Sequence, residues 1–134
     1  MTPEGLTIRP SSHGPKETMD RLAAALAARG IAVLARIDHT SAAAQAGMEL
    51  RPTEVLIFGN PRAGTPLMQA VQTIGIDLPL KALVWQDAAG QTWLATNDPA
   101  WVARRHGAEG GAERVLGAMR DVLEAVAKEA TDPS

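Results

Sequence analysis

The sequence contains no cysteine, no tyrosine and a single phenylalanine. Without cysteine the protein has no disulfides, no thiolate metal site and no cysteine nucleophile. Without tyrosine, no phenol can act in a site. Uninterrupted apolar runs are also short, and none approaches the roughly 18 residues of a membrane span. Any chemistry must therefore come from histidine, carboxylates, basic side chains, hydroxyls and the backbone.

Neither sign of charge is in large excess. Thirteen Lys and Arg face fifteen Asp and Glu, which gives a formal net charge of −2. No basic block exists, so binding to nucleic acid has little electrostatic support. Residues 1–10 show no basic segment followed by an apolar one, as a signal peptide would. We therefore expect a soluble, cytoplasmic protein with neither nucleic acid nor membrane among its partners.

What the sequence does contain is a clear succession of short elements. Apolar spacing predicts strands at residues 6–9, 31–38, 55–58, 80–86 and 92–97. It predicts helices at residues 15–29, 40–46, 66–74, 99–106 and about 113–128. The second helix is expected to be capped by Thr40 or Ser41, and the third by Thr65. The continuous apolar run at 55–58 is typical of a strand buried on both faces.

The connection between the last two strands, residues 87–91, is short enough to predict an antiparallel hairpin. This hairpin interrupts a strict alternation of strands and helices. An α+β fold follows: one two-layer domain with a small mixed or antiparallel sheet covered by helices. A chain of 134 residues suits one domain. We expect residues 1–134 to form it, packed from about 5 to 129 and frayed from 130 to 134.

The segment FGNPRAGTPLM, residues 58–68, is the strongest candidate site. Its two glycines and two prolines impose a specific backbone path. A helix that begins after Thr65 would offer free N–H groups and a positive dipole end to an anion. This predicts a small polar or anionic ligand contacted by Asn60, Gly64 and Thr65. The alternative is that Asn60 and Thr65 only cap their own loop. The segment is neither a Walker A loop nor a GxGxxG dinucleotide motif.

The segment FGNPRAGTPLM, followed by DLPLK at residues 77–81, resembles the signature of the domain of unknown function 302 family. The stretches 37–39, 47–52, 97–99 and 105–106 are also similar to it. The likeness spans nearly the whole chain. It implies a compact α+β domain, and similar members form homodimers. It implies no activity, because none is established for the family.

Two histidines, His39 and His106, lie at predicted element ends. Histidine is the usual acid–base group at neutral pH and a common metal ligand. Asp38, Asp77 and Asp98 supply carboxylates at other element ends. A cluster of both histidines and one of these carboxylates would form a proton-transfer or metal site. The alternative for His106 is that it caps the carbonyls of its helix. Neither histidine has the spacing of a known metal motif, and the sequence points to no cofactor.

Asp77 and Lys81 flank a proline just before a strand. If Lys81 faced a cleft, it could bind an anion or pair with Asp77. If it faced water, it would be an ordinary charge that discourages aggregation. The expected site is the place where Asn60, Gly64 and Thr65 meet these two residues and His39.

Three functions are consistent with the sequence, and whether the protein is an enzyme stays open. The first is a small-ligand-binding domain that forms a homodimer. The second is an enzyme that uses His39 or His106. The third is a homodimeric interaction domain without a small-molecule site, in which Trp85 and Trp93 of the hairpin form the working surface, because tryptophan is enriched at interfaces.

Overall fold

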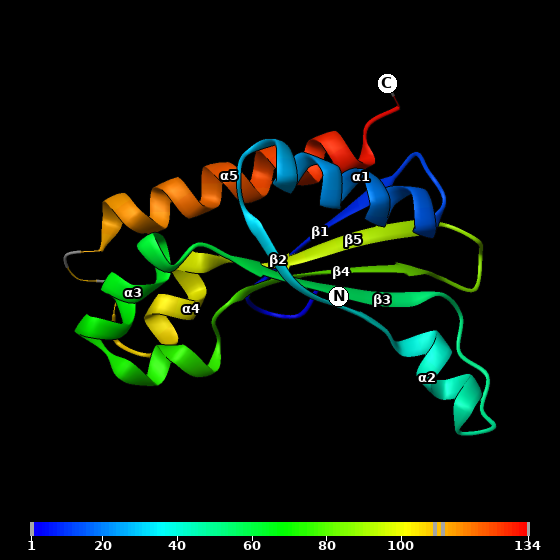
Figure 1. Cartoon of the computed structure of the whole chain (residues 1–134), viewed down its shortest axis with the longest axis horizontal. Coiled ribbons are helices and arrows are strands. Elements are labelled where there is room, and N and C mark those ends of the chain that lie inside the picture. Colours follow the sequence, from blue (N-terminus) through cyan, green and yellow to red (C-terminus); the bar gives the residue numbers. More distant parts are fainter. Residues whose placement is uncertain (1, 109, 111, 134) are drawn as a thin grey trace.

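The computed structural model describes residues 2–108, 110 and 112–133. The strands are β1 (Leu6–Ser11), β2 (Ala32–Asp38), β3 (Thr53–Gly59), β4 (Leu80–Gln86) and β5 (Thr92–Asn97). The helices are α1 (Pro15–Ala28), α2 (His39–Gln45), α3 (Pro61–Ala70), the 3-10 helix η1 (Gln72–Ile76), α4 (Pro99–Arg105) and α5 (Glu113–Thr131). Figure 1 shows how they are arranged.

The five strands form one sheet in the order β1-β5-β4-β3-β2. Every neighbouring pair in it is antiparallel, and β4 and β5 form the predicted hairpin. The predicted α+β fold is confirmed, with the antiparallel form of its sheet. The strands β1 and β2 form the two edges of the sheet, and β4 is its central strand.

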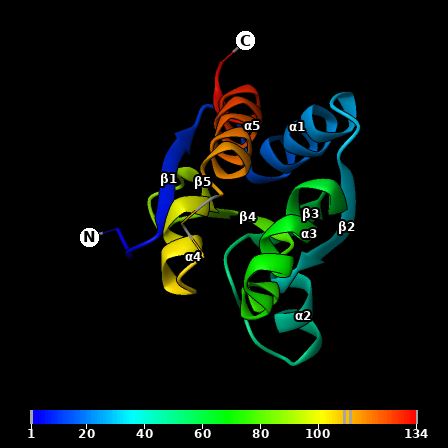
Figure 2. The ribbon, with the colours of Figure 1, turned by 90° about the vertical axis from the view of Figure 1, so that its left-hand side faces the viewer.

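Helices α1 and α5 pack side by side on one face of the sheet (Figures 1 and 2). Their apolar stripes and the inward residues of the three central strands form the main core. Its largest fully buried members are Phe58, Met19, Leu22, Leu26 and Leu56. Burying such side chains contributes about 1.5–3 kcal/mol each.

Helices α3 and α4 and the start of α5 gather at one end of the sheet around a second apolar cluster (Figure 2). Ile74 of η1 and Ala103 of α4 are completely buried in it. Trp101 of α4 also covers Gly5, which has a φ of 83°. A Cβ at Gly5 would come within 2.4 Å of the indole, so glycine is required there on two grounds.

The start of α3 differs from the prediction. The helix begins at Pro61, with Asn60 as its cap, and Pro66 lies inside it. The prediction that Thr65 caps this helix is therefore wrong. Asn60-Pro61 and Thr65-Pro66 are equally good starting signals, with a capping side chain before a proline at the first helical position. The earlier signal prevails, and the helix tolerates a missing N–H at Pro66.

The cap of α2 also differs from the prediction. Asp38 caps the helix by accepting a hydrogen bond from Ser41 N–H at 3.0 Å. Thr40 instead donates to the carbonyl of Arg51 and accepts from Thr53 N–H. Its hydroxyl therefore joins the two ends of the α2 segment, and Thr40 or Ser41 as the cap is wrong.

The carboxyl end is more ordered than expected. Helix α5 continues to Thr131, and Ala130 and Thr131 are buried. Ser12 N–H donates to the carbonyl of Thr131 at 2.8 Å, which fixes the helix end to the chain after β1. Fraying from residue 130 is thus wrong for these two residues, and Ser134 lies outside the described part of the chain.

Candidate functional site

The face of the sheet opposite α1 and α5 is apolar and only partly buried. Strand alternation places every second residue of the central strands on it. We call this surface the uncovered face. Its members on the described strands include Ile37, Val55, Ile57, Leu83, Trp85, Trp93 and Ala95. Apart from Ala95, none of these is fully buried, and neither apolar cluster contains them. The prediction that residues 55–58 are buried on both faces is therefore wrong for Val55 and Ile57.

The two hairpin tryptophans lie on this face near the turn that joins β4 and β5. Trp85 is directly opposite Trp93 in the register of β4 and β5. The indole N–H of Trp93 donates to Asp87 Oδ2 at 2.9 Å, so the ring is held in one orientation. Hydrogen bonds from Trp93 and from backbone N–H groups lower the pKa of Asp87, because they favour its charged form. The hairpin thus presents a pre-organised aromatic pair.

Helix α2 and the loop after it project from the same side of the sheet as the uncovered face (Figure 1). None of the α2 side chains is buried. In the loop, Met48 and Leu50 are 67% and 44% exposed. A helix of seven residues has little intrinsic stability in water, and packing normally supplies it. This arm and the uncovered face are therefore two apolar features on one side of the molecule.

The structure places Asn60, Gly64 and Thr65 in the first part of α3. Asn60 Oδ1 accepts from Arg62 N–H, and its carbonyl accepts from Ala63 and Gly64 N–H. Pro61 has no N–H. Asn60 itself therefore accepts the hydrogen bonds of the N–H groups at this helix start. This agrees with the alternative in which Asn60 only caps its own loop. Gly64 and Thr65 lie within the helix.

Asp77 and His106 come together, as the acid–base hypothesis requires. His106 Nε2 lies 2.5 Å from Asp77 Oδ2, and Thr73 Oγ1 lies 2.9 Å from His106 Nδ1. Arg105 donates to both carboxylate oxygens of Asp77, at 2.8 and 2.9 Å. The cluster joins η1 to the end of α4. Nothing in the sequence spacing pointed to Thr73.

Two opposing influences act on Asp77. Partial burial by itself would raise the pKa of this carboxyl. The hydrogen bond from His106 and the charge of Arg105 outweigh burial and leave the pKa below its ordinary value. Asp77 is therefore held as a carboxylate. Both ring nitrogens of His106 have hydrogen-bond partners. This arrangement is consistent with a structural link and equally with a proton relay.

Lys81 and His39 lie apart from this cluster. Lys81 is on the uncovered face, where its ammonium lies 3.4 Å from the carbonyl of Pro79. His39 begins α2 at one end of the sheet, whereas Asn60 follows β3 at the other, about 20 Å away for a strand of this length. The structure does not bring His39 to Asn60 or to His106. In the described ranges, no three His, Asp or Glu side chains are grouped so that they could hold a metal ion.

Comparison with known families gives a clear result. The family model for "Domain of unknown function DUF302" matches residues 7–126. The chain belongs to this family. The crystal structure of a DUF302 protein from Bacillus stearothermophilus has the same fold, with a TM-score of 0.84. The two chains share 21% identity, and the match covers 96% of this chain and 99% of the other.

Closer relatives carry a different name. Over 102 residues the DUF302 chain is 51% identical to "Fluoride-specific ion channel FluC 1" of Brucella suis biovar 1 and of Brucella abortus biovar 1. The match covers 76% of this chain but only 40% and 38% of those proteins. This chain thus spans about two-fifths of their length. None of the helices in the described residues has the length and apolar character needed to cross a bilayer.

Proposed function

We propose that this DUF302 protein is a homodimeric interaction domain, in which the uncovered face of one protomer packs against the same face of the other. The observation that supports it is the continuous row of partly exposed apolar side chains with the Trp85–Trp93 pair at one end. Contiguous apolar patches of this kind mark interaction sites on proteins. Tryptophan is the residue most enriched at the energetic centres of interfaces.

The charge of the surface favours a second copy over a charged partner. Of the described strand residues on the uncovered face, Lys81 is the only charged one. A two-fold symmetric dimer brings one patch against itself, so an apolar patch is automatically complementary. A standard interface buries about 800 Å² on each partner, which is the scale of one sheet face.

The α2 arm gives a second reason. It lies on the same side as the uncovered face, with Met48 and Leu50 exposed in its loop. In a face-to-face dimer the arm of each protomer would lie beside its partner. Packing there would stabilise a helix that has no fully buried side chain within its own chain.

Isotope-filtered NMR tests the proposal. A sample mixed from ¹³C-labelled and unlabelled protein gives cross-protomer NOEs only between different copies. We expect these NOEs between the rings of Trp85 or Trp93 and methyl groups of Val55, Ile57 or Leu83. Cross-protomer NOEs confined to α1 and α5, or none at millimolar concentration, would refute the proposed interface.

Two finer predictions from the sequence stand beside this proposal. Ligand binding at residues 58–66 is testable by thermal shift with phosphate and small anions, using Thr65→Ala as the variant. The satisfied donors at Asn60 argue for a purely structural segment. Use of His106 as an acid–base is supported by its contact with Asp77.

The Brucella relatives suggest a second candidate function, a role beside fluoride transport. It is favoured by 51% identity to proteins that are named as fluoride channels and are more than twice as long as the matched segment. In such a role the DUF302 domain would bind or sense fluoride. A ¹⁹F NMR titration tests this: broadening or a shift of the fluoride signal supports it, and an unchanged signal at equimolar protein contradicts it.

A further inference from the structure

We infer that the two sheets of the proposed dimer pack with their central strands in opposite directions, so that the ammonium of Lys81 contacts the indole ring of the partner's Trp85. This inference rests on the proposed function, because it concerns the same uncovered face. It adds the orientation of the second copy and one pair of contacting side chains. The observation that carries it is the uneven distribution of charge and aromatic rings along β4.

Strand β4 is the middle strand of the sheet and therefore the centre of the uncovered face. Lys81, Leu83 and Trp85 all lie on this face, because side chains alternate along a strand. With a rise of about 3.3 Å per residue, Lys81 and Trp85 are about 13 Å apart, and Leu83 is midway between them. The ammonium of Lys81 lies near the carbonyl of Pro79, on the side away from Trp85.

Lys81 is a partly buried charge that lacks an opposite charge. In the described part of the chain, no carboxylate lies within ion-pair distance of it. Its ammonium is 3.4 Å from the carbonyl of Pro79, which is longer than an ordinary hydrogen bond from nitrogen to oxygen. Covering this ammonium with an apolar surface is unfavourable unless another group compensates for the lost water. A dimer through the uncovered face therefore requires such a group opposite Lys81.

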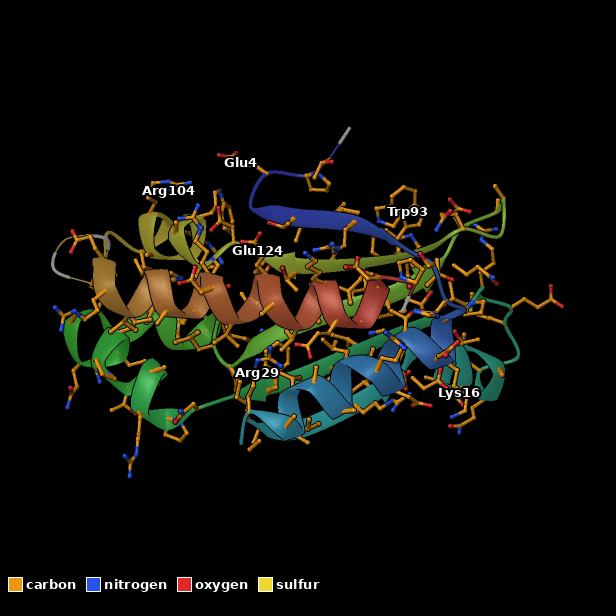
Figure 3. All side chains as sticks on the ribbon, turned by 90° about the horizontal axis from the view of Figure 1, so that it is seen from above. Glu4, Lys16, Arg29, Trp93, Arg104 and Glu124 are labelled. Atoms are coloured by element: carbon orange, nitrogen blue, oxygen red, sulfur yellow. The ribbon has the colours of Figure 1, made fainter. Side chains whose placement is uncertain are left out.

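The aromatic pair at the other end of β4 supplies this group. The face of an indole ring attracts a cation, and Trp85 and Trp93 lie side by side there. Asp87 accepts the hydrogen bond of Trp93 at 2.9 Å and adds a carboxylate beside the rings. The charge of Arg51 also acts on Asp87, so the rings provide the main part of the attraction. In Figure 3, Trp93 is labelled toward the end of the sheet opposite α4.

Two orientations of a two-fold dimer bring this face against itself with aligned strands. If the strands run in the same direction, Lys81 lies opposite the partner's Lys81, because β4 is central. Two ammonium groups then meet in an apolar interface, which is unfavourable. If the strands run in opposite directions about an axis at Leu83, Lys81 lies opposite the partner's Trp85. The charges therefore favour the second orientation.

A double-mutant cycle of dimer dissociation constants tests the inference. Lys81→Met removes the ammonium and keeps the apolar stem, Trp85→Leu removes the ring, and a third variant carries both changes. Positions about 13 Å apart have additive effects unless the side chains meet across the interface. We expect the Kd of the double variant to be at least fivefold lower than the product of the single effects. Lys128→Met, an exposed change on α5, is the matched control and should leave the Kd unchanged.

Isotope-filtered NMR on the mixed labelled and unlabelled sample observes the contact itself. We expect cross-protomer NOEs between the Hε protons of Lys81 and the ring protons of the partner's Trp85. NOEs between the two Trp85 rings of a dimer would instead show that the strands run in the same direction.

The outcomes separate this inference from the proposed function. A dimer through the uncovered face that shows additive single effects, or NOEs between its two Trp85 rings, overturns the inference and keeps the proposed interface. A chain that stays monomeric, or cross-protomer NOEs confined to α1 and α5, overturns both.

Discussion

Both faces of the central strands are rich in apolar side chains, but their surroundings differ greatly. On the covered face, Leu56, Phe58 and Leu94 are at most 1% exposed beneath α1 and α5. One residue along the same strands, Val55, Ile57 and Leu83 stay partly exposed. The apolar character of a strand residue therefore does not show whether helices of the same chain cover its face of the sheet. The proposed dimer accounts for the apolar side chains of the uncovered face, because a second copy of the chain would cover them.

The largest expected effect comes from truncating an apolar side chain on each face and comparing the losses of stability. Phe58→Ala should lower the free energy of unfolding by about 3–5 kcal/mol, because it leaves a cavity in the core. Ile57→Ala, the neighbour on the other face, should cost less at low protein concentration and more as dimer forms. Urea denaturation at two protein concentrations measures both. If the loss of stability in Ile57→Ala does not depend on protein concentration, the two faces do not differ in the way proposed.

A charge on the uncovered face should break the dimer without unfolding the protomer. Leu83→Arg places a guanidinium in the middle of the proposed interface, and we expect the dimer dissociation constant to rise at least 100-fold, or about 2.7 kcal/mol. The far-UV circular dichroism should stay unchanged. Arg114→Gln on α5 serves as the control for an unrelated change of charge. Dimerisation equal to that of the native chain would locate the interface elsewhere.

A smaller effect is expected at the link between η1 and α4. Asp77→Asn removes the partner of His106 and Arg105, and should lower stability by about 1–2 kcal/mol at neutral pH. The folded pKa of Asp77 is depressed, so its stabilisation is present above the unfolded value of 3.8 and is lost as pH falls through the folded pKa.

The pH dependence distinguishes this link from a general charge effect. The difference between native and Asp77→Asn proteins should therefore shrink below pH 4, as measured by urea denaturation across pH. Asp121→Asn changes an exposed carboxylate of α5 and should cost little at any pH. A constant difference down to pH 2 would show that the carboxylate charge is not the source of the stabilisation.

The smallest predicted change concerns the start of α3. Asn60→Ala should cost about 1 kcal/mol through loss of the cap, and Asn60→Asp should restore most of it. Thermal denaturation measures both variants. If Asn60→Ala leaves the melting temperature unchanged, the cap does not stabilise the fold, and the purely structural explanation of residues 58–66 loses its support.

Local signals in the sequence explain much of the fold. The hairpin, for example, follows from the short 87–91 connection. Where two adjacent signals compete, as at Asn60-Pro61 and Thr65-Pro66, local chemistry cannot decide which one prevails. The run Val55–Phe58 was misread because an uncovered apolar face and a buried one have the same sequence pattern.

The candidate sites were harder to predict because they depend on distant segments. His106 and Asp77 are 29 residues apart, and their contact exists only because η1 packs against the end of α4. His39 has a similar setting in the sequence, yet it lies at the other end of the sheet.

Sedimentation equilibrium of the native chain and of Leu83→Arg tests the dimer proposal most directly. If the uncovered face is the interface, the native protein should sediment at twice its chain mass of 14.1 kDa, and Leu83→Arg at that mass itself. A native protein that sediments at 14.1 kDa over the whole micromolar range, or a Leu83→Arg variant that stays dimeric, would contradict the proposal.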